Sequence, residues 1–402
     1  MERKNFDLVW NEKAAERRED ISFFNVEEAG KARKFHNTFS MYQETPLVSL
    51  QNLAEKLQVK SIYLKDESKR FGLNAFKVLG ASYAIANEIG RRIGKEITEL
   101  SAESILSKET KEKIGDITFV TATDGNHGRG VAWTANKLGQ KSVVYMPKGS
   151  ALERLENIRA EGAEAEITDM NYDDAVRLAQ KMAEEKGWIV VQDTAWEGYE
   201  DIPRWIMQGY TTMGHEIMEQ IPEKPTHIFL QAGVGSMAGA MTGFFSNLYK
   251  EDKPIIVIVE PAKADCLFQT AKADDGKLHT VTGDMDTIMA GLACGEPCTI
   301  GWDVLKGYAD AFIRCPEYAA ADGMRILASP VKGDTAVTAG ESGAAAFGCM
   351  ANILMDQDLA EWKKLLKLDG NAKILCISTE GDTDQKNYQD VVWGGKYAKY
   401  SE

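Results

Sequence analysis

Strands and helices alternate along much of this chain of 402 residues, and the alternation limits the possible folds more than any other feature. Apolar runs that fit strands are separated by segments with helical spacing, at 117–122, 142–146, 164–168 and 188–192. Further strands are expected at 61–67, 227–231, 255–259, 311–314 and 373–378. This order is typical of βαβ units, whose strands form parallel sheets. It predicts an α/β protein with two open, twisted, mostly parallel sheets flanked by helices.

The strands between residues 117 and 192 form a group within the longer pattern. A chain of 402 residues is long enough to bury two separate cores. We therefore predict a small α/β subdomain over residues 88–204, inserted in a large domain made of residues 1–87 and 205–402.

Some local signals refine this outline. Ser150 and Glu153 fit a capping box for one helix of the subdomain, and Asp173 is expected to cap the next helix. Residues 261–303 contain several glycines and two prolines, so this segment is expected to consist largely of loops.

Composition excludes several classes of partner. The chain has 44% hydrophobic and 27% charged residues, which is ordinary for a soluble globular protein. Its net charge of −14 argues against nucleic acid and against an anionic membrane surface. No apolar run is long enough to span a membrane, and MERKNFDLVW does not resemble a secretory signal, so a cytoplasmic location is expected.

The six cysteines are scattered and form no CxxC motif, which predicts reduced thiols. Cys294 and Cys298 are close in sequence, but no histidine or second cysteine pair lies nearby, so no metal site is predicted. Whether Cys266, Cys294 or Cys298 forms a disulfide stays open at this point.

The stretch NAFKVLGA places Lys77 at the start of a helix with one apolar face. A hydrophobic surrounding and a helix N-terminus both disfavour the ammonium form, so the pKa of Lys77 is expected to fall below its usual value. A free amine can act as a nucleophile. Taken alone, the stretch fits a solvated lysine better, because most lysines are exposed.

Another candidate loop, TDGNHG, joins a predicted strand to a predicted helix. Its glycines let the backbone approach a ligand, and Asn126 offers both a hydrogen-bond donor and an acceptor. A plain turn between strand and helix explains the same pattern equally well. His127, in the same loop, is interpreted as structural more readily than as catalytic.

The segment QAGVGSMAG exposes backbone N–H groups where a strand passes into a helix, which favours a phosphate site. The residues concerned are Ala232, Gly233, Val234, Gly235 and Ser236. A dinucleotide site is the rival interpretation, in which Glu260 at the end of the next strand would bind a ribose. The spacing GxGxxxG differs from the dinucleotide pattern GxGxxG, which weakens that alternative.

The last candidate loop, STEGDTD, follows the apolar strand KILCI. A hydroxyl group from Ser378 or Thr379 could meet a ring nitrogen there, although a polar turn is the simpler interpretation of this loop alone. All four loops lie at strand ends or helix starts, where ligands gather in open α/β sheets.

Together, the four loops resemble those of fold type II pyridoxal-phosphate enzymes, the superfamily of the tryptophan synthase β chain and the threonine dehydratases. The resemblance covers residues from about 40 to 390. It implies that pyridoxal 5'-phosphate is bound covalently at Lys77 beside Phe76, that Asn126 meets its phenolic oxygen, and that the loop 232–236 holds its phosphate. It implies further that Ser378, or as a second choice Thr379, meets the pyridine nitrogen.

Within the superfamily the chain is most similar to the diaminopropionate ammonia-lyases. The segments that carry this similarity are FHNTFSMYQETPLVSL, TDGNHGRGVAW, VVQDTAWEGYEDIPRWIMQGY and QAGVGSMAG. The resemblance implies α,β-elimination of D- and L-2,3-diaminopropionate to pyruvate and two ammonia. Lys77 would serve one face of the cofactor and Asp124 the other, with Asp193 as a second carboxylate in the cleft.

Alternatives to this function stay open from the sequence. A serine or threonine dehydratase would share the fold. A nicotinamide-dependent dehydrogenase would use the glycine loop and Glu260, and a non-catalytic small-molecule binding protein would use the loops without chemistry. The family is usually dimeric, so a homodimer is expected, and the aromatic residues of the first 40 residues could pack across its interface.

Overall fold

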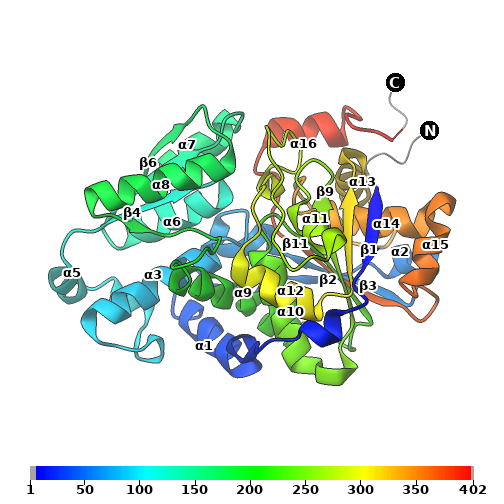
Figure 1. The fold of residues 1–402 in the computed structure, drawn as a ribbon, viewed down its shortest axis with the longest axis horizontal. Helices are drawn as coiled ribbons and strands as arrows, with labels where there is room; N and C mark the ends of the chain where they lie inside the picture. Colours follow the sequence, from blue (N-terminus) through cyan, green and yellow to red (C-terminus); the bar gives the residue numbers. More distant parts are fainter. Residues whose placement is uncertain (1–5, 400–402) are drawn as a thin grey trace.

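The computed structural model describes residues 6–399, and its strands form two sheets, one of seven and one of four strands (Figure 1). The outer ends of the predicted large domain, residues 1–5 and 400–402, lie outside the described residues. In spatial order, the larger sheet consists of β1 (Asp7–Trp10), β10 (Ala311–Cys315), β9 (Ile255–Pro261), β8 (His227–Gln231), β11 (Lys373–Ser378), β3 (Ser61–Asp66) and β2 (Leu47–Ser49).

The five inner strands of the larger sheet are parallel, and β1 and β2 pair antiparallel at its two edges. The smaller sheet has the order β6 (Glu164–Ile167), β5 (Lys141–Met146), β4 (Thr118–Ala122) and β7 (Ile189–Val190), and all of its pairs are parallel. The predicted α/β class with two mostly parallel sheets is therefore confirmed, and the edge strands β1 and β2 were not predicted.

Helices cover both sheets, and those of the smaller sheet form a lobe of their own at the upper left of Figure 1. This lobe contains α6 (Asn126–Lys137), α7 (Leu152–Ala160) and α8 (Tyr172–Lys186). The first part of the chain contributes α1 (Val26–His36), α2 (Gln51–Lys56), α3 (Val78–Ile93), α4 (Ala102–Ile105) and α5 (Lys108–Ile114). The later part contributes α9 (Asp201–Gln220), α10 (Ser236–Tyr249), α11 (Cys266–Ala273), α12 (Thr299–Tyr308), α13 (Glu317–Ala328), α14 (Ala345–Met355), α15 (Ala360–Leu365) and α16 (Gln385–Val392).

The close packing of α3 on α9 sets the position of Lys77. A Cβ atom on Gly209 would lie 2.4 Å from the backbone oxygen of Leu79, so only glycine lets the two helices approach this far. Lys77 is the N-cap residue of α3, immediately before this contact. The rigid helix pair therefore holds the backbone of Lys77 at a fixed place beside the larger sheet.

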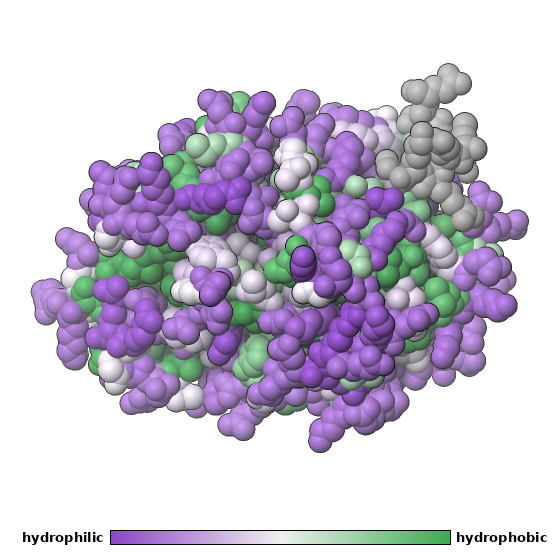
Figure 2. All heavy atoms as spheres, viewed as in Figure 1, coloured by the Kyte–Doolittle hydropathy of each residue, from purple (hydrophilic) through white to green (hydrophobic). Residues whose placement is uncertain are grey.

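Among residues 6–399 no helix is both long enough and apolar enough to cross a membrane. Figure 2 shows that the face seen in Figure 1 is covered mainly by hydrophilic residues, with apolar residues in separate groups. All six cysteines are buried and free, which answers the question of a disulfide among Cys266, Cys294 and Cys298. The aromatic residues Phe24, Phe35 and Phe39 are buried against the protein's own core.

Candidate active site

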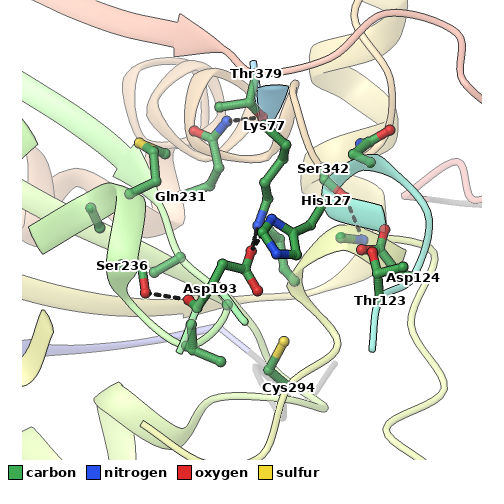
Figure 3. A pocket seen from close by; sticks show the side chains of 18 of the residues that line it. Lys77, Thr123, Asp124, His127, Asp193, Gln231, Ser236, Cys294, Ser342 and Thr379 are labelled. Carbon is green, nitrogen blue, oxygen red and sulfur yellow. Dashed lines mark hydrogen bonds and ion pairs between the residues drawn. The ribbon is translucent and has the colours of Figure 1, made fainter. Parts of the chain in front are cut away.

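A cavity lies between the two sheets, where the loops after β4, β7, β8 and β11 meet (Figure 3). The carboxyl ends of parallel strands are the usual place for ligands in such sheets. The predicted site residues that line this cavity are Phe76, Lys77, Asp124, Asn126, Asp193, Ala232, Gly233, Val234, Gly235, Ser236 and Thr379. Ser378 is completely buried and does not line the cavity.

The loop that carries Lys77 is tied to the loop after β11 by backbone hydrogen bonds. The N–H group of Phe76 donates to the oxygen of Thr379 over 3.2 Å, and the N–H group of Gly381 donates to the oxygen of Asn74 over 3.0 Å. Asn74 adopts a positive φ of 61°, which turns the chain into the first residues of α3. Two stretches about 300 residues apart in the chain are thus fixed side by side, so Lys77 and Thr379 share one cavity.

The Lys77 ammonium group forms an ion pair with the Asp193 carboxylate (Figure 3). Burial lowers the pKa of Lys77, but the Asp193 charge outweighs it, and the pKa lies above its usual value. The prediction of a lowered pKa was therefore wrong. Asp193 is also buried, yet His127 and Lys77 lower its pKa to about 2, so it remains a carboxylate.

His127 lies beside this ion pair on the first turn of α6. Its Nε2 atom is 2.7 Å from the backbone oxygen of Val191 and so donates to it. Its Nδ1 atom lies 3.8 Å from Asp193 Oδ2 and forms no hydrogen bond with the described residues. Burial lowers the pKa of His127, which favours the neutral imidazole.

The glycine loop forms the start of α10. Gly235 is its N-cap residue with φ of +100°, and none of the described side chains caps this helix. The first-turn N–H groups of a helix need an acceptor, and an anion can supply it. A Cβ atom on Gly235 would lie 3.2 Å from Leu267 Cδ1, so the loop has little space for a larger residue.

Three polar side chains, those of Asn126, Gln231 and Thr379, also line the cavity. Asn126 donates a hydrogen bond from Nδ2 to the Glu380 carboxylate. Gln231 donates from Nε2 to Thr379 Oγ1 over 2.9 Å, which leaves the hydroxyl hydrogen of Thr379 free for another acceptor. The Ser378 hydroxyl instead lies 3.4 Å from the backbone oxygen of Glu380, outside the cavity.

Asp124 lies on the side of the cavity near Ser342 (Figure 3). Its carboxylate pairs with Arg154 over 3.0 Å. Tyr172, Cys294 and Ser342 also line the cavity, although no motif in the sequence marked them as part of a site. The Tyr172 hydroxyl donates to Asp193 Oδ1 over 3.3 Å, but a tyrosine at a helix start carries no signal of such a contact.

The dinucleotide alternative fails at Glu260. This carboxylate is completely buried and accepts hydrogen bonds from the N–H groups of Leu267 at 2.9 Å and Phe268 at 2.6 Å, at the start of α11. Both of its oxygen atoms are therefore engaged by the protein, and no ribose can reach them.

Comparisons with known proteins agree with this geometry. A family model described as pyridoxal-phosphate dependent enzyme matches residues 39–379. Diaminopropionate ammonia-lyase from Salmonella typhimurium is 51% identical, over 94% of this chain and 95% of that protein.

Two solved structures of the Escherichia coli diaminopropionate ammonia-lyase share the fold closely. The complex with D-serine has a TM-score of 0.91 and 46% identity, with 98% of each chain covered. The complex with an aminoacrylate–PLP azomethine reaction intermediate has a TM-score of 0.88 at the same identity and coverage. The chain belongs to the pyridoxal-phosphate-dependent enzymes of fold type II and, within them, to the family of the diaminopropionate ammonia-lyases.

Proposed function

We infer that the chain is a carbon–nitrogen lyase that uses pyridoxal 5'-phosphate to convert D- and L-2,3-diaminopropionate to pyruvate and two ammonia. The observation that carries this function is the 51% identity to a diaminopropionate ammonia-lyase over nearly the whole chain. The cavity also contains a lysine and two carboxylates. These groups can supply the nucleophilic amine and the proton acceptors that elimination from a diamino acid requires. Neither a nicotinamide-dependent dehydrogenase nor a non-catalytic binding protein fits this family.

The residues of the cavity fit the cofactor. The uncapped start of α10 offers backbone N–H groups to a phosphate, and Lys77 offers an amine for covalent attachment. Asn126 is assigned to the phenolic oxygen, and Phe76 borders the same space. When bound, pyridoxal phosphate withdraws electrons from the α-carbon of an attached amino acid, which makes the α-proton acidic and allows a β-substituent to leave.

Thr379 is the better candidate for the pyridine nitrogen, because its hydroxyl faces the cavity and has a hydrogen to donate. Ser378, our first choice from the sequence, is turned away from the cavity. A hydroxyl is uncharged and a poor acid, so it leaves a pyridine nitrogen unprotonated. That arrangement limits charge on the ring and favours elimination over transamination.

Lys77 and Asp124 are assigned as the two proton acceptors. As a neutral amine, Lys77 Nζ takes the α-proton of the L-isomer, and the Asp124 carboxylate takes that of the D-isomer. Asp193 and Asp124 are both negative groups near the place where a substrate ammonium would lie, and both attract the β-ammonium group that serine lacks. The β-amine leaves as ammonia, and the released 2-aminoacrylate hydrolyses in water to pyruvate and a second ammonia.

Replacing Gly235 by alanine is expected to weaken cofactor binding at least about tenfold. The residue has a positive φ of +100°, which costs an alanine roughly 1–2 kcal/mol, and its Cβ would press on Leu267. The dissociation constant of pyridoxal phosphate, titrated into apoenzyme, measures the effect. Gly276 is a matched control, because it also has a positive φ, of +77°, but lies outside the cavity, and a Cβ atom there would meet nothing within 4 Å. Equal retention in the Gly235→Ala and Gly276→Ala variants would contradict the phosphate assignment.

A direct assay tests the function. Ammonia and pyruvate released from D- and L-2,3-diaminopropionate are measured beside pyruvate from D- and L-serine. We expect kcat/KM for both diaminopropionate isomers to exceed that for serine by about two orders of magnitude, since a hydrogen bond to a charged group contributes about 1.5–3 kcal/mol. A preference for serine would instead identify a dehydratase.

The location, assembly and domain limits are further parts of the proposal. Six buried free thiols support a reducing, cytoplasmic setting. A homodimer remains part of the proposal, because the family that the chain resembles is usually dimeric. The limits expected at 87/88 and 204/205 fall inside α3 and α9, so we place the ends of the small domain at the ends of these helices, near 94 and 200.

A further inference from the structure

Arg154 joins Asp124 to the opposite side of the active-site cleft. It lies on α7, beside the smaller sheet, and its side chain is 3% exposed. Its Nη1 atom lies 3.0 Å from Asp124 Oδ2, and its Nη2 atom lies 2.8 Å from Glu341 Oε1. Glu341 precedes α14, which packs against the larger sheet. One guanidinium group therefore bridges two carboxylates that come from the two sides of the cleft.

The loop of Asp124 also packs on the aliphatic part of Arg154. A Cβ atom on Gly125 would lie 3.0 Å from Arg154 Cδ, so the backbone next to Asp124 rests directly on this side chain. A planar guanidinium with fixed donor directions restricts a carboxylate more than a flexible ammonium does. Arg154 thus restrains both the backbone and the carboxylate of residue 124.

Asp124 needs such a restraint because it lies between two cavities. Besides the active-site cavity, it lines a second one together with Lys148, Asp169 and Asp284. Arg154 and Glu341 line this second cavity as well, so Asp124 lies at the boundary between the two spaces. The ion pair with Arg154 restricts rotation of the carboxylate at this boundary.

We propose that Arg154 is a positioning residue that fixes the Asp124 carboxylate in one orientation, at the edge of the active-site cavity, for proton removal from the D-isomer. The proposal rests on the function proposed above for Asp124. Lys77 has its own partner, Asp193, and does not depend on Arg154. Loss of Arg154 therefore changes the reaction of the D-isomer more than that of the L-isomer.

The test compares kcat for D- and L-2,3-diaminopropionate in the Arg154→Lys variant of the holoenzyme. Lysine keeps the positive charge but cannot hold two carboxylates in fixed directions. We expect the ratio of kcat for the D-isomer to kcat for the L-isomer to fall about tenfold or more, with a smaller change in KM. Both isomers are assayed on one preparation, so the ratio does not depend on the fraction of enzyme that has folded.

Two further variants separate positioning from a general structural role. Arg159→Lys changes an exposed arginine on the same helix and is expected to keep the wild-type ratio. In an Asp124→Asn background, Arg154→Lys is expected to change the ratio no further, because the residue through which it acts is already lost.

The outcomes distinguish the role proposed for Arg154 from the role proposed for Asp124. Equal losses on both isomers in Arg154→Lys, beside an altered ratio in Asp124→Asn, would overturn the role of Arg154 alone. An unaltered ratio in Asp124→Asn would overturn the role of Asp124 and, with it, the inference for Arg154. A further fall in the ratio in the double variant would show that Arg154 acts by another route.

Discussion

Replacing Lys77 by alanine is expected to lower kcat on both isomers of 2,3-diaminopropionate by roughly four orders of magnitude. The change removes the amine that attaches the cofactor and the proton acceptor for the L-isomer together. The kcat on the D-isomer is expected to fall as well, because the cofactor is no longer held covalently between turnovers. The loss is measured as pyruvate and ammonia formed under saturating pyridoxal phosphate.

Borohydride reduction followed by peptide mapping locates the same group chemically. The pyridoxyl label is expected on the peptide that contains Lys77 and is expected to be absent from the Lys77→Ala variant. Lys77→Arg preserves the positive charge beside Asp193 but cannot form the bond, so it is expected to be inactive as well. Lys69→Ala is the matched control, because this lysine is exposed and lies shortly before the site in the chain. A label on another lysine, or turnover in Lys77→Arg, would end the assignment.

The ion pair of Lys77 with Asp193 shows what a sequence does not reveal about an ionisable group. The apolar helix face and the helix N-terminus around Lys77 predict a lowered pKa. The partner that reverses the shift is 116 positions away in the chain, after the last strand of the other sheet. Local sequence therefore identified the lysine, whereas its protonation depends on how the two sheets are placed.

The fold and most of the cavity followed from simpler rules. The strand and helix periods predicted the inner strands of both sheets. Loops at the carboxyl ends of parallel strands converge on one edge of a sheet, so four separate loops could be assigned to one site. The choice between Ser378 and Thr379 needed the structure, because neighbouring residues at a strand end point to opposite sides.

Helix starts were less predictable than the strands. The helix after Pro147 begins at Leu152 with Ala151 as N-cap, and Ser150 instead donates to the Pro147 oxygen over 2.8 Å. Asn171, not Asp173, caps α8, and α11 begins within the segment expected to be loop. The N–H groups of Leu267 and Phe268, in the first turn of α11, are satisfied by Glu260 from the end of β9, so a local capping signal is absent.

Replacing Asp124 by asparagine is expected to lower activity on D-2,3-diaminopropionate by roughly two orders of magnitude or more, the usual contribution of a general base. Asparagine keeps the shape of the side chain and can still accept a hydrogen bond from Arg154. It cannot remove a proton and carries no negative charge. Activity on the L-isomer is expected to fall less, because Lys77 remains and only the attraction for the β-ammonium group is reduced.

Comparison of the substrates separates the loss of proton removal from the loss of attraction for the β-ammonium group. D-serine lacks the β-ammonium group, so its loss in Asp124→Asn is expected to match the loss of proton removal alone. Asp169→Asn is the control, because Asp169 is an exposed carboxylate of the neighbouring cavity, and it is expected to affect both isomers equally little. Steady-state kcat and KM for the three substrates, measured with one cofactor-saturated preparation of each variant, provide the comparison.

Equal losses on both isomers would mean that Asp124 serves binding or cofactor geometry instead of proton removal from one face. Full activity of Asp124→Asn on the D-isomer would remove Asp124 from the reaction, and Asp193 would become the carboxylate to test. Asp193 is a weaker candidate in the structure, because its pKa of about 2 makes it a poor base. Asp124 pairs with Arg154 and not with Lys77. Its carboxylate therefore lines the cavity without binding the catalytic amine.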